Sequence, residues 1–288
     1  VMMPINEDFL KSKGEAFGAP TDPSSILYNG PFVLKSITAK SSIEMAKNDA
    51  YWDKDAVKIQ NIKFTFWDGK DQDVVAKGFS EGQYSKARIY PTSSTYEKYA
   101  SEFKDNIFFN EPGSAIATVS VNYGRTTYNH TSKTTDSQKE STRKALLNKE
   151  FRQALNFAVD RNSYSAQTNG TDGAAVAIRN TFSPYDLQVG DKQFGKLVEE
   201  SLAKTNSSTW SNVSLADSQN GLYNEEKAKA AFAKAKESLK AEGVEFPIHL
   251  DALTIQESTA VVNRVQSLKQ SIENVLGSDN VVIDLQQM

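Results

Sequence analysis

Near the end of the chain, apolar residues are spaced first as in a strand and then as in a helix. Residues 246–250 alternate apolar and polar side chains, which is typical of a half-buried strand. From 261 to 275 the apolar positions recur every three or four residues, which predicts a helix that Gly277 ends. The apolar run 281–283 predicts a second strand. This order predicts a βαβ unit with two parallel strands and a right-handed crossover.

Two amphipathic helices are expected before this unit. Asn148 and Asn224 are good N-cap residues, and each is followed by apolar positions at helical spacing. The first stripe consists of Leu147, Phe151, Ala154, Leu155 and Ala158, and the second of Ala228, Phe232, Ala235 and Leu239. Both stripes are expected to face the core.

The first half of the chain has shorter patterns. A polar helix is expected around Phe9, followed by three strands with hairpin-like connections. Beyond residue 71 the spacing favours helix, strand, helix and strand in turn, and residues 124–143 are polar enough to predict a surface loop or flap. The predicted strands are 32–34, 43–46, 62–66, 87–90 and 115–123, and the predicted helices in this part are centred on 74–79 and 96–103.

Composition narrows the possible functions. The 288 residues are 39% hydrophobic and 24% charged, an ordinary balance for a folded protein. A net charge of −3 gives no basic surface for nucleic acid. With no cysteine, disulfides, thiolate metal sites and cysteine nucleophiles are excluded. We find neither a targeting segment nor a stretch of membrane-spanning length.

Three motifs follow one another along the chain. They are Tyr28-Asn29-Gly30-Pro31-Phe32, Asn48-Asp49-Ala50-Tyr51-Trp52, and the helix Phe151-Arg152-Gln153-Ala154-Leu155-Asn156-Phe157-Ala158-Val159-Asp160-Arg161. Taken together, the chain resembles the oligopeptide-binding proteins of ABC importers, which form part of extracytoplasmic solute-binding protein family 5, and most closely the Ami/Ali-type lipoproteins of Gram-positive bacteria. The resemblance extends over nearly the whole chain. The motifs themselves are expected to be scaffold, with Asp160 and Arg161 capping or pairing at the end of their helix.

The resemblance implies an α/β fold of the type II periplasmic-binding-protein-like class, with a mixed sheet flanked by helices. Residues 1–288 would form a single lobe, the central one of a two-lobe protein whose other lobe lies outside this chain. The implied partners are oligopeptides and the permease subunits of an ABC transporter, without nucleic acid, cofactor, metal or catalytic residues. The implied location is the outer face of a Gram-positive cell membrane, reached through a lipid anchor that this chain lacks.

Candidate peptide contacts come from strand ends and loops, where open α/β folds bind their ligands. The segment Arg88-Ile89-Tyr90-Pro91 matches a family strand end that lines the peptide cleft. Arg88 is suited to a peptide carboxylate, and Tyr90 to stacking on a side chain or donating its hydroxyl. A surface arginine and a half-buried strand tyrosine are the competing interpretation. Weaker candidates from similar positions are Trp67, Asn122, Arg179 and Asn180.

Two other classes of function remain open. A carbohydrate-binding module or glycosidase would stack sugars on Trp52, Trp67 and Trp210 and use paired carboxylates. A surface adhesin or interaction domain would need no small ligand. The only histidines, His130 and His249, have no partner motif for a nucleophile.

Overall fold

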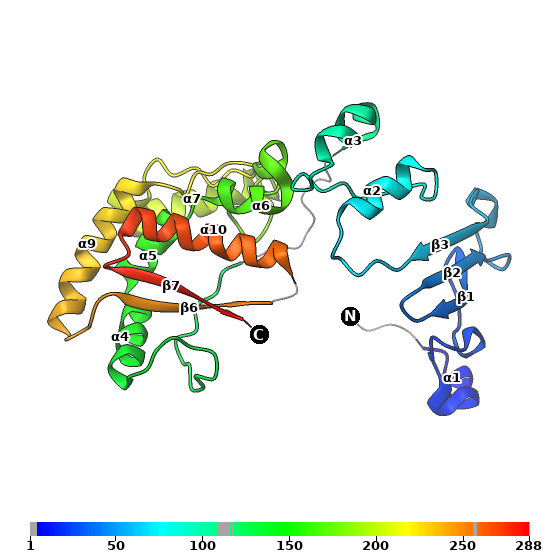
Figure 1. Cartoon of the computed structure of the whole chain (residues 1–288), viewed down its shortest axis with the longest axis horizontal. Helices are drawn as coiled ribbons and strands as arrows, with labels where there is room; N and C mark the ends of the chain where they lie inside the picture. Colours follow the sequence, from blue (N-terminus) through cyan, green and yellow to red (C-terminus); the bar gives the residue numbers. More distant parts are fainter. Residues whose placement is uncertain (1–4, 109–115, 117, 256–257, 288) are drawn as a thin grey trace. The chain divides into compact units, whose positions relative to one another are not determined.

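The chain divides into two compact units, Val1–Asp71 and Gln72–Met288. The computed structural model describes residues 5–108, 116, 118–255 and 258–287 (Figure 1). The assignment of 1–288 to a single lobe stays a prediction.

The first unit is built on a three-stranded antiparallel sheet with the order β1-β2-β3. Ile37 of β1 pairs with Ile43 of β2, which pairs with Phe64 of β3, so one row of the sheet is apolar across all three strands. The helix and strands of this unit are α1 (Glu7–Lys13), β1 (Phe32–Thr38), β2 (Ser42–Lys47) and β3 (Asn61–Thr65). The predicted N-terminal helix and the three hairpin-connected strands are therefore confirmed.

Two of the sequence motifs meet inside this unit. The buried Asn48 side chain donates a hydrogen bond to the Gly30 carbonyl (2.8 Å), and its backbone N–H donates to the Pro31 carbonyl (2.9 Å). The same side chain accepts from the backbone N–H of Ala50 (3.0 Å), which fixes the turn before Tyr51. The buried Asn48 amide thus holds the motifs 28–32 and 48–52 together through hydrogen bonds, which is a scaffold role.

The second unit contains the remaining α-helices and strands of the described residues (Figure 1). Short 3-10 turns occur in the chain at Gly14–Ala16, Pro23–Ser25, Lys54–Ala56 and Lys104–Asn106. The helices and strands of the second unit are α2 (Asp73–Ser80), α3 (Tyr96–Glu102), α4 (Asp136–Leu147), α5 (Lys149–Ala158), α6 (Arg161–Ala174), β4 (Gln188–Val189), β5 (Lys192–Gln193), α7 (Phe194–Thr205), α8 (Ser207–Trp210), α9 (Glu225–Ala241), β6 (Ile248–Thr254), α10 (Thr259–Leu276) and β7 (Val281–Gln287).

The predicted βαβ unit is confirmed: β6 and β7 pair in parallel, with α10 between them in sequence. Ile248 pairs with Val281 and Leu250 with Ile283, so these side chains share one face of the strand pair. That face belongs to the core, and α10 packs along β7 (Figure 1).

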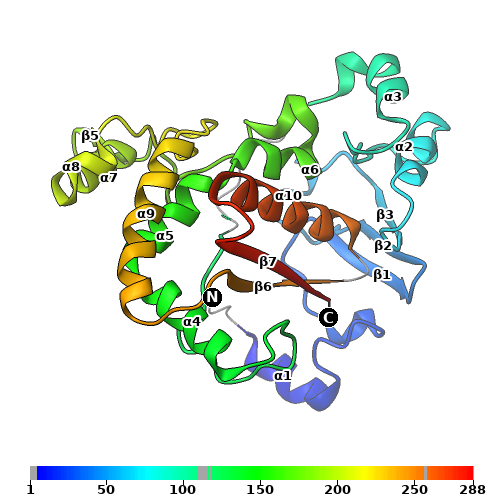
Figure 2. The same cartoon turned by 60° about the vertical axis from the view of Figure 1, so that its left-hand side comes forward.

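The two amphipathic helices form the rest of this core. Figure 2 shows α5 and α9 lying side by side. Asn148 and Asn224 cap them as expected, each accepting a hydrogen bond from the backbone N–H three residues on. The ring centroids of Phe151 and Phe232 are 6.3 Å apart, and Phe151 is 0% exposed. Leu147 does not join the first stripe, because its side chain is half exposed.

Three local predictions are wrong. Residues 87–90 lie in an irregular segment and form no strand. Residues 118–123 form no strand either, and positions 115 and 117 of that prediction lie outside the described residues. The predicted loop 124–143 ends early because α4 begins at Asp136 behind a Thr135–Gln138 capping box.

The described strands form three separate sheets, one parallel and two antiparallel. None of the helices in the described part of the chain is long and apolar enough to cross a membrane.

Candidate functional site

The Arg88-to-Pro91 segment lies in the irregular stretch between α2 and α3. Arg88 is exposed, and its guanidinium carbon lies 4.7 Å from the centre of the half-buried Tyr90 ring. Such a stack orients the guanidinium while leaving its outer N–H groups available. The two residues expected first from sequence are thus in contact with each other.

Pro91 holds the end of this segment against α6. At Gly170 the helix departs from helical geometry, with φ at 64°. A Cβ added at Gly170 would come within 2.3 Å of the Pro91 Cβ, so only glycine allows this close approach. The kink in α6 therefore helps position the segment that carries Arg88 and Tyr90.

Arg179 and Asn180 are held by their own loop contacts. The Arg179 guanidinium Nε lies 3.7 Å from an Asp217 carboxylate oxygen, and its side chain is 9% exposed. The Asn180 amide donates to the backbone carbonyls of Ala216 and Gln219 at 3.0 and 2.8 Å. These contacts join the loop after α6 to the loop before α9. Arg179 and Asn180 therefore have a structural role at this place.

Trp67 and Asn122 make local contacts. The Trp67 indole N–H donates to the Asp71 carbonyl (2.9 Å) within the first unit. The exposed Asn122 accepts from the Gly124 backbone N–H (3.1 Å) in the second unit. The structure therefore joins the candidates in two local groups, 88–91 and 179–180. Their role as ligand contacts stays a prediction.

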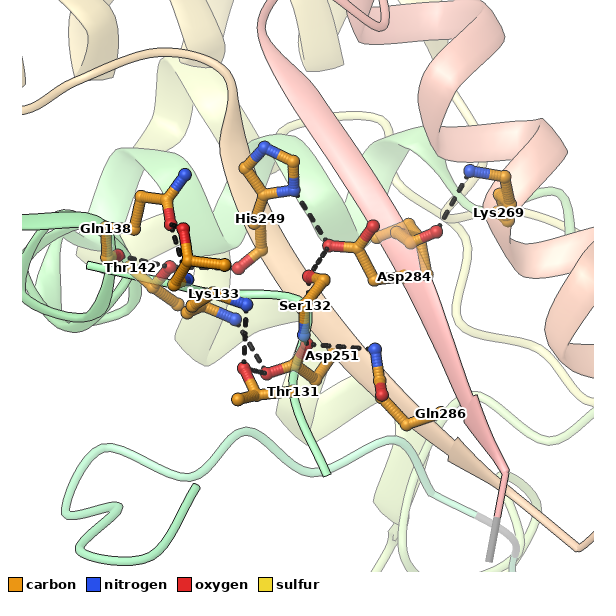
Figure 3. A network of polar contacts seen from close by, with 12 residues as sticks. Thr131, Ser132, Lys133, Gln138, Thr142, His249, Asp251, Lys269, Asp284 and Gln286 are labelled. Carbon is orange, nitrogen blue, oxygen red and sulfur yellow. Dashed lines mark hydrogen bonds and ion pairs between the residues drawn. The ribbon is translucent and has the colours of Figure 1, made fainter. Parts of the chain in front are cut away.

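A network that the sequence did not reveal lies on the second face of the β6–β7 pair (Figure 3). His249 and Asp251 alternate on β6 with the core residues, and Asp284 and Gln286 do the same on β7. In this register Asp251 lies directly beside Asp284. Two adjacent carboxylates repel each other unless cations or hydrogen-bond donors compensate for their charge.

Segment 125–133 supplies that compensation. The buried Lys133 ammonium lies 2.7 Å from an Asp251 oxygen, and the Arg125 guanidinium lies 2.5 Å from the same oxygen. The Thr131 hydroxyl and the Ser132 backbone N–H also donate to Asp251, at 2.7 and 3.1 Å. The segment is thereby fastened to β6 through one carboxylate whose side chain is 2% exposed.

The electrostatics follow from these donors. Burial by itself would raise the pKa of the Asp251 carboxyl. The hydrogen bonds that it accepts, led by the one from Lys133, outweigh burial and lower the pKa to about 2. Asp251 is therefore ionised throughout the physiological range.

This arrangement does not provide nucleophilic or glycosidase chemistry. The Ser132 hydroxyl donates to Asp284 (2.6 Å), and the His249 ring Nδ1 contacts that same carboxylate (2.8 Å), so the histidine does not act as the base of the serine. A glycosidase acid needs a raised pKa, whereas the pKa of Asp251 is lowered. No cluster of three or more metal-ligating side chains occurs within the described ranges. The network fixes a loop onto the strand pair.

The tryptophans of the carbohydrate alternative divide between the two units and are held in separate local contacts. Trp210 packs on Phe157 at the edge of the core of the second unit, with ring centroids 5.2 Å apart. Trp52 is 84% exposed and contacts Tyr51, while Trp67 is tied to its own loop.

Only one signal in the sequence could have indicated the network. His249 is the polar position inside the predicted strand 246–250, and Asp251, Asp284 and Gln286 continue the alternation just beyond the predicted strands 246–250 and 281–283. That pattern marks a second face of the strand pair but does not identify Lys133 or Arg125 as its partners.

Comparison with known proteins defines the family. A family model described as bacterial extracellular solute-binding proteins, family 5 Middle, matches residues 1–286. The oligopeptide-binding protein AmiA of Streptococcus pneumoniae serotype 4 is 56% identical over 289 residues, covering 100% of this chain and 44% of AmiA. The oligopeptide-binding protein SarA of Streptococcus gordonii is 55% identical, covering 100% of this chain and 43% of SarA. The chain thus spans less than half the length of these relatives.

Solved structures agree on the fold. Listeria monocytogenes OppA bound to peptide has a TM-score of 0.56 at 19% identity, covering 99% of this chain and 46% of that one. The substrate-binding domain of an oligopeptide ABC transporter from Bacillus anthracis has a TM-score of 0.55 at 16% identity, with coverage of 99% and 46%. The predicted α/β, type II periplasmic-binding-protein-like fold is confirmed. Because the family model matches residues 1–286 and AmiA is 56% identical over the whole of this chain, the chain belongs to the bacterial extracellular solute-binding proteins of family 5.

Proposed function

We propose that the protein containing this chain captures extracellular oligopeptides between two closing lobes and delivers them to an ABC permease. In this proposal the chain supplies one lobe. The observation that carries it is the 56% identity to the oligopeptide-binding protein AmiA over the whole chain. The two units and their helices then act as a scaffold for peptide-binding loops.

The chemistry of peptide capture suits the described residues. An extended peptide satisfies its backbone groups on strand edges and loops, while its side chains enter roomy pockets. This task needs no nucleophile, metal or cofactor, so we infer a binding protein without catalytic activity. By the same resemblance, we infer a lipid anchor in the full-length protein and a place on the outer face of a Gram-positive membrane.

Peptide binding is expected to depend on the complete protein. At the length of its relatives, the protein should bind a mixed pool of oligopeptides, while the 288-residue chain alone should bind at least about 100-fold more weakly, because it lacks lobe closure. Titration calorimetry with the same synthetic peptides on both proteins measures this difference. Equal and tight binding by both proteins would contradict the two-lobe proposal. Binding to sugars on a glycan array, together with no binding to any of the peptides, would favour the carbohydrate alternative.

Arg88 and Tyr90 are the proposed peptide contacts in this lobe, flanked by Ile89 and Pro91. The exposed guanidinium, stacked on the Tyr90 ring, is suited to a peptide carboxylate. We also propose weaker contributions from strand ends and loops elsewhere: Trp67, Asn122, Arg179 and Asn180.

The Arg88→Ala variant of the complete protein is expected to bind peptides about tenfold more weakly, because it loses a charged hydrogen bond. Capping the peptide as a C-terminal amide should remove most of the difference between variant and wild type. The matched control is Lys86→Ala, an exposed cation two residues away. If both variants weaken binding equally, Arg88 acts only through the positive charge that it shares with Lys86. The proposal that Arg88 contacts the peptide is then wrong.

A further inference from the structure

The three-stranded sheet of the first unit (Figure 1) has two faces of opposite chemistry. Residues that pair directly across antiparallel strands point to the same face. One face is mostly polar, and there Glu44 of β2 and Lys63 of β3 form an ion pair of 3.1 Å. The other face is apolar at nearly every paired position: Phe32, Leu34 and Ile37 on β1, Ile43 and Met45 on β2, and Ile62 and Phe64 on β3.

The apolar face is open to solvent. Ile37, Ile43 and Phe64, which form one row across the three strands, are 36%, 39% and 55% exposed. Phe66, directly after β3, is 52% exposed. Within residues 5–71 no apolar side chain is buried. The first unit therefore contains one half of a hydrophobic core without the other half.

A sheet of this kind is stable only when its apolar face is covered. Three antiparallel strands hold together in water when their hydrophobic face packs against another layer. The second unit provides such a layer by itself, because α10 packs along β7 and the apolar face of that strand pair belongs to the core. In the first unit α1 buries none of its residues, so it is not that layer. A face that must stay covered is typical of a permanent interface, which resembles a core cut in half.

We propose that polypeptide of the full-length protein outside residues 1–288 packs on this apolar face and completes the core of the first unit. The length of the relatives supports this occupant. The whole chain matches only 44% of AmiA and 43% of SarA, so more than half of each relative lies outside the matched region. The packing segment should be apolar where it touches the sheet, because the face itself offers apolar surface rather than charges.

A membrane surface and a second copy of the chain are the competing occupants. Elements that lie on membranes carry several lysines or arginines beside their apolar face. Here the one charged residue among the paired positions of the face is Lys47, and its ammonium donates to the Val57 carbonyl (3.0 Å). A second copy covers the face only at concentrations that favour association, whereas polypeptide of the same chain is always present. The inference needs only the longer polypeptide, so it holds whether or not the protein binds peptides.

Hydroxyl-radical footprinting of the complete protein, in lipid-free solution and at the length of its relatives, tests the inference. Met45, Phe64 and Phe66 should be oxidised at least about tenfold more slowly in the native protein than in the urea-unfolded protein, because solvent reaches a covered side chain only when the structure opens. Comparable rates in the two states would overturn the proposal. Light scattering gives the association state. Protection that is lost on dilution to monomers would assign the face to a second copy, and protection that requires added anionic vesicles would assign it to a membrane. Either result also overturns the proposal.

Two variants of the complete protein separate the two faces of β3. Phe64→Asp places a charge on the apolar face and should lower the melting temperature by several degrees or prevent folding, because a covered charge without a partner is unfavourable. Thr65→Asp, at the adjacent exposed position on the polar face, should leave the melting temperature nearly unchanged. Equal effects of the two variants would contradict the inference. Neither measurement involves peptide binding, so its failure is distinct from a failure of the proposed function.

Discussion

Replacing Asp251 by asparagine is expected to lower the free energy of unfolding by about 3 to 5 kcal/mol, the usual cost of breaking a buried ion pair from one side. The change leaves the Lys133 ammonium, whose side chain is 1% exposed, without its counter-ion. Urea denaturation measures the loss. Fluorescence from Trp210 alone, in a Trp52→Phe/Trp67→Phe background, restricts the signal to the second unit.

Two matched variants test the cause. Asp279→Asn, an exposed carboxylate after α10, should change the stability by less than about 0.5 kcal/mol. The double variant Asp251→Leu/Lys133→Met should recover much of the loss, because replacing both members of a buried pair by apolar residues is often nearly neutral. If Asp251→Asn is as mild as Asp279→Asn, the carboxylate is not what fastens segment 125–133.

The same carboxylate predicts a pH dependence. Because the pKa of Asp251 is lowered to about 2 in the folded chain, its contribution is complete above about pH 4 and disappears as the pH falls through 2. The stability difference between wild type and Asp251→Asn should therefore shrink by about 2 kcal/mol from pH 4 to pH 2. Carboxylates distant from Asp251 contribute equally to both proteins and cancel in this difference.

Replacing Phe151 by alanine is expected to cost about 3 to 5 kcal/mol, through lost burial and the cavity left behind. Phe151 is 0% exposed, and its ring projects from α5 against the Phe232 ring of α9. The same urea titration measures the effect, with Phe182→Ala as control because that side chain is 79% exposed. A loss below about 1 kcal/mol for Phe151→Ala would mean that the α5–α9 contact is not the centre of the core.

Much of the fold could be predicted from the sequence because its signals are local. Asn224 precedes an apolar stripe at helical spacing, and the helix begins and packs as that pattern indicates. The strand predicted at 87–90 is wrong because a strand depends on a partner and not only on local sequence. Its short alternation before Pro91 has no neighbouring strand among the described residues, and an extended segment gains little without one.

The candidate sites were less predictable than the fold. The bond between Asp251 and Lys133 spans 118 residues of sequence, and nothing near either residue in the chain indicates that they are partners. Such pairs arise only after helices and strands have packed.

The family motifs, the capped helices and the strands and helix of the βαβ unit follow from local sequence, because caps and apolar periodicity act within a few residues of one another. Tertiary packing is what buries Lys133, which lies in a polar run that predicts a surface loop, on the second face of the β6–β7 pair. The physical reason is that a charge can be buried only where a counter-charge and hydrogen bonds compensate for lost hydration. For Lys133 that compensation comes from Asp251 on β6, a partner that the local pattern does not specify.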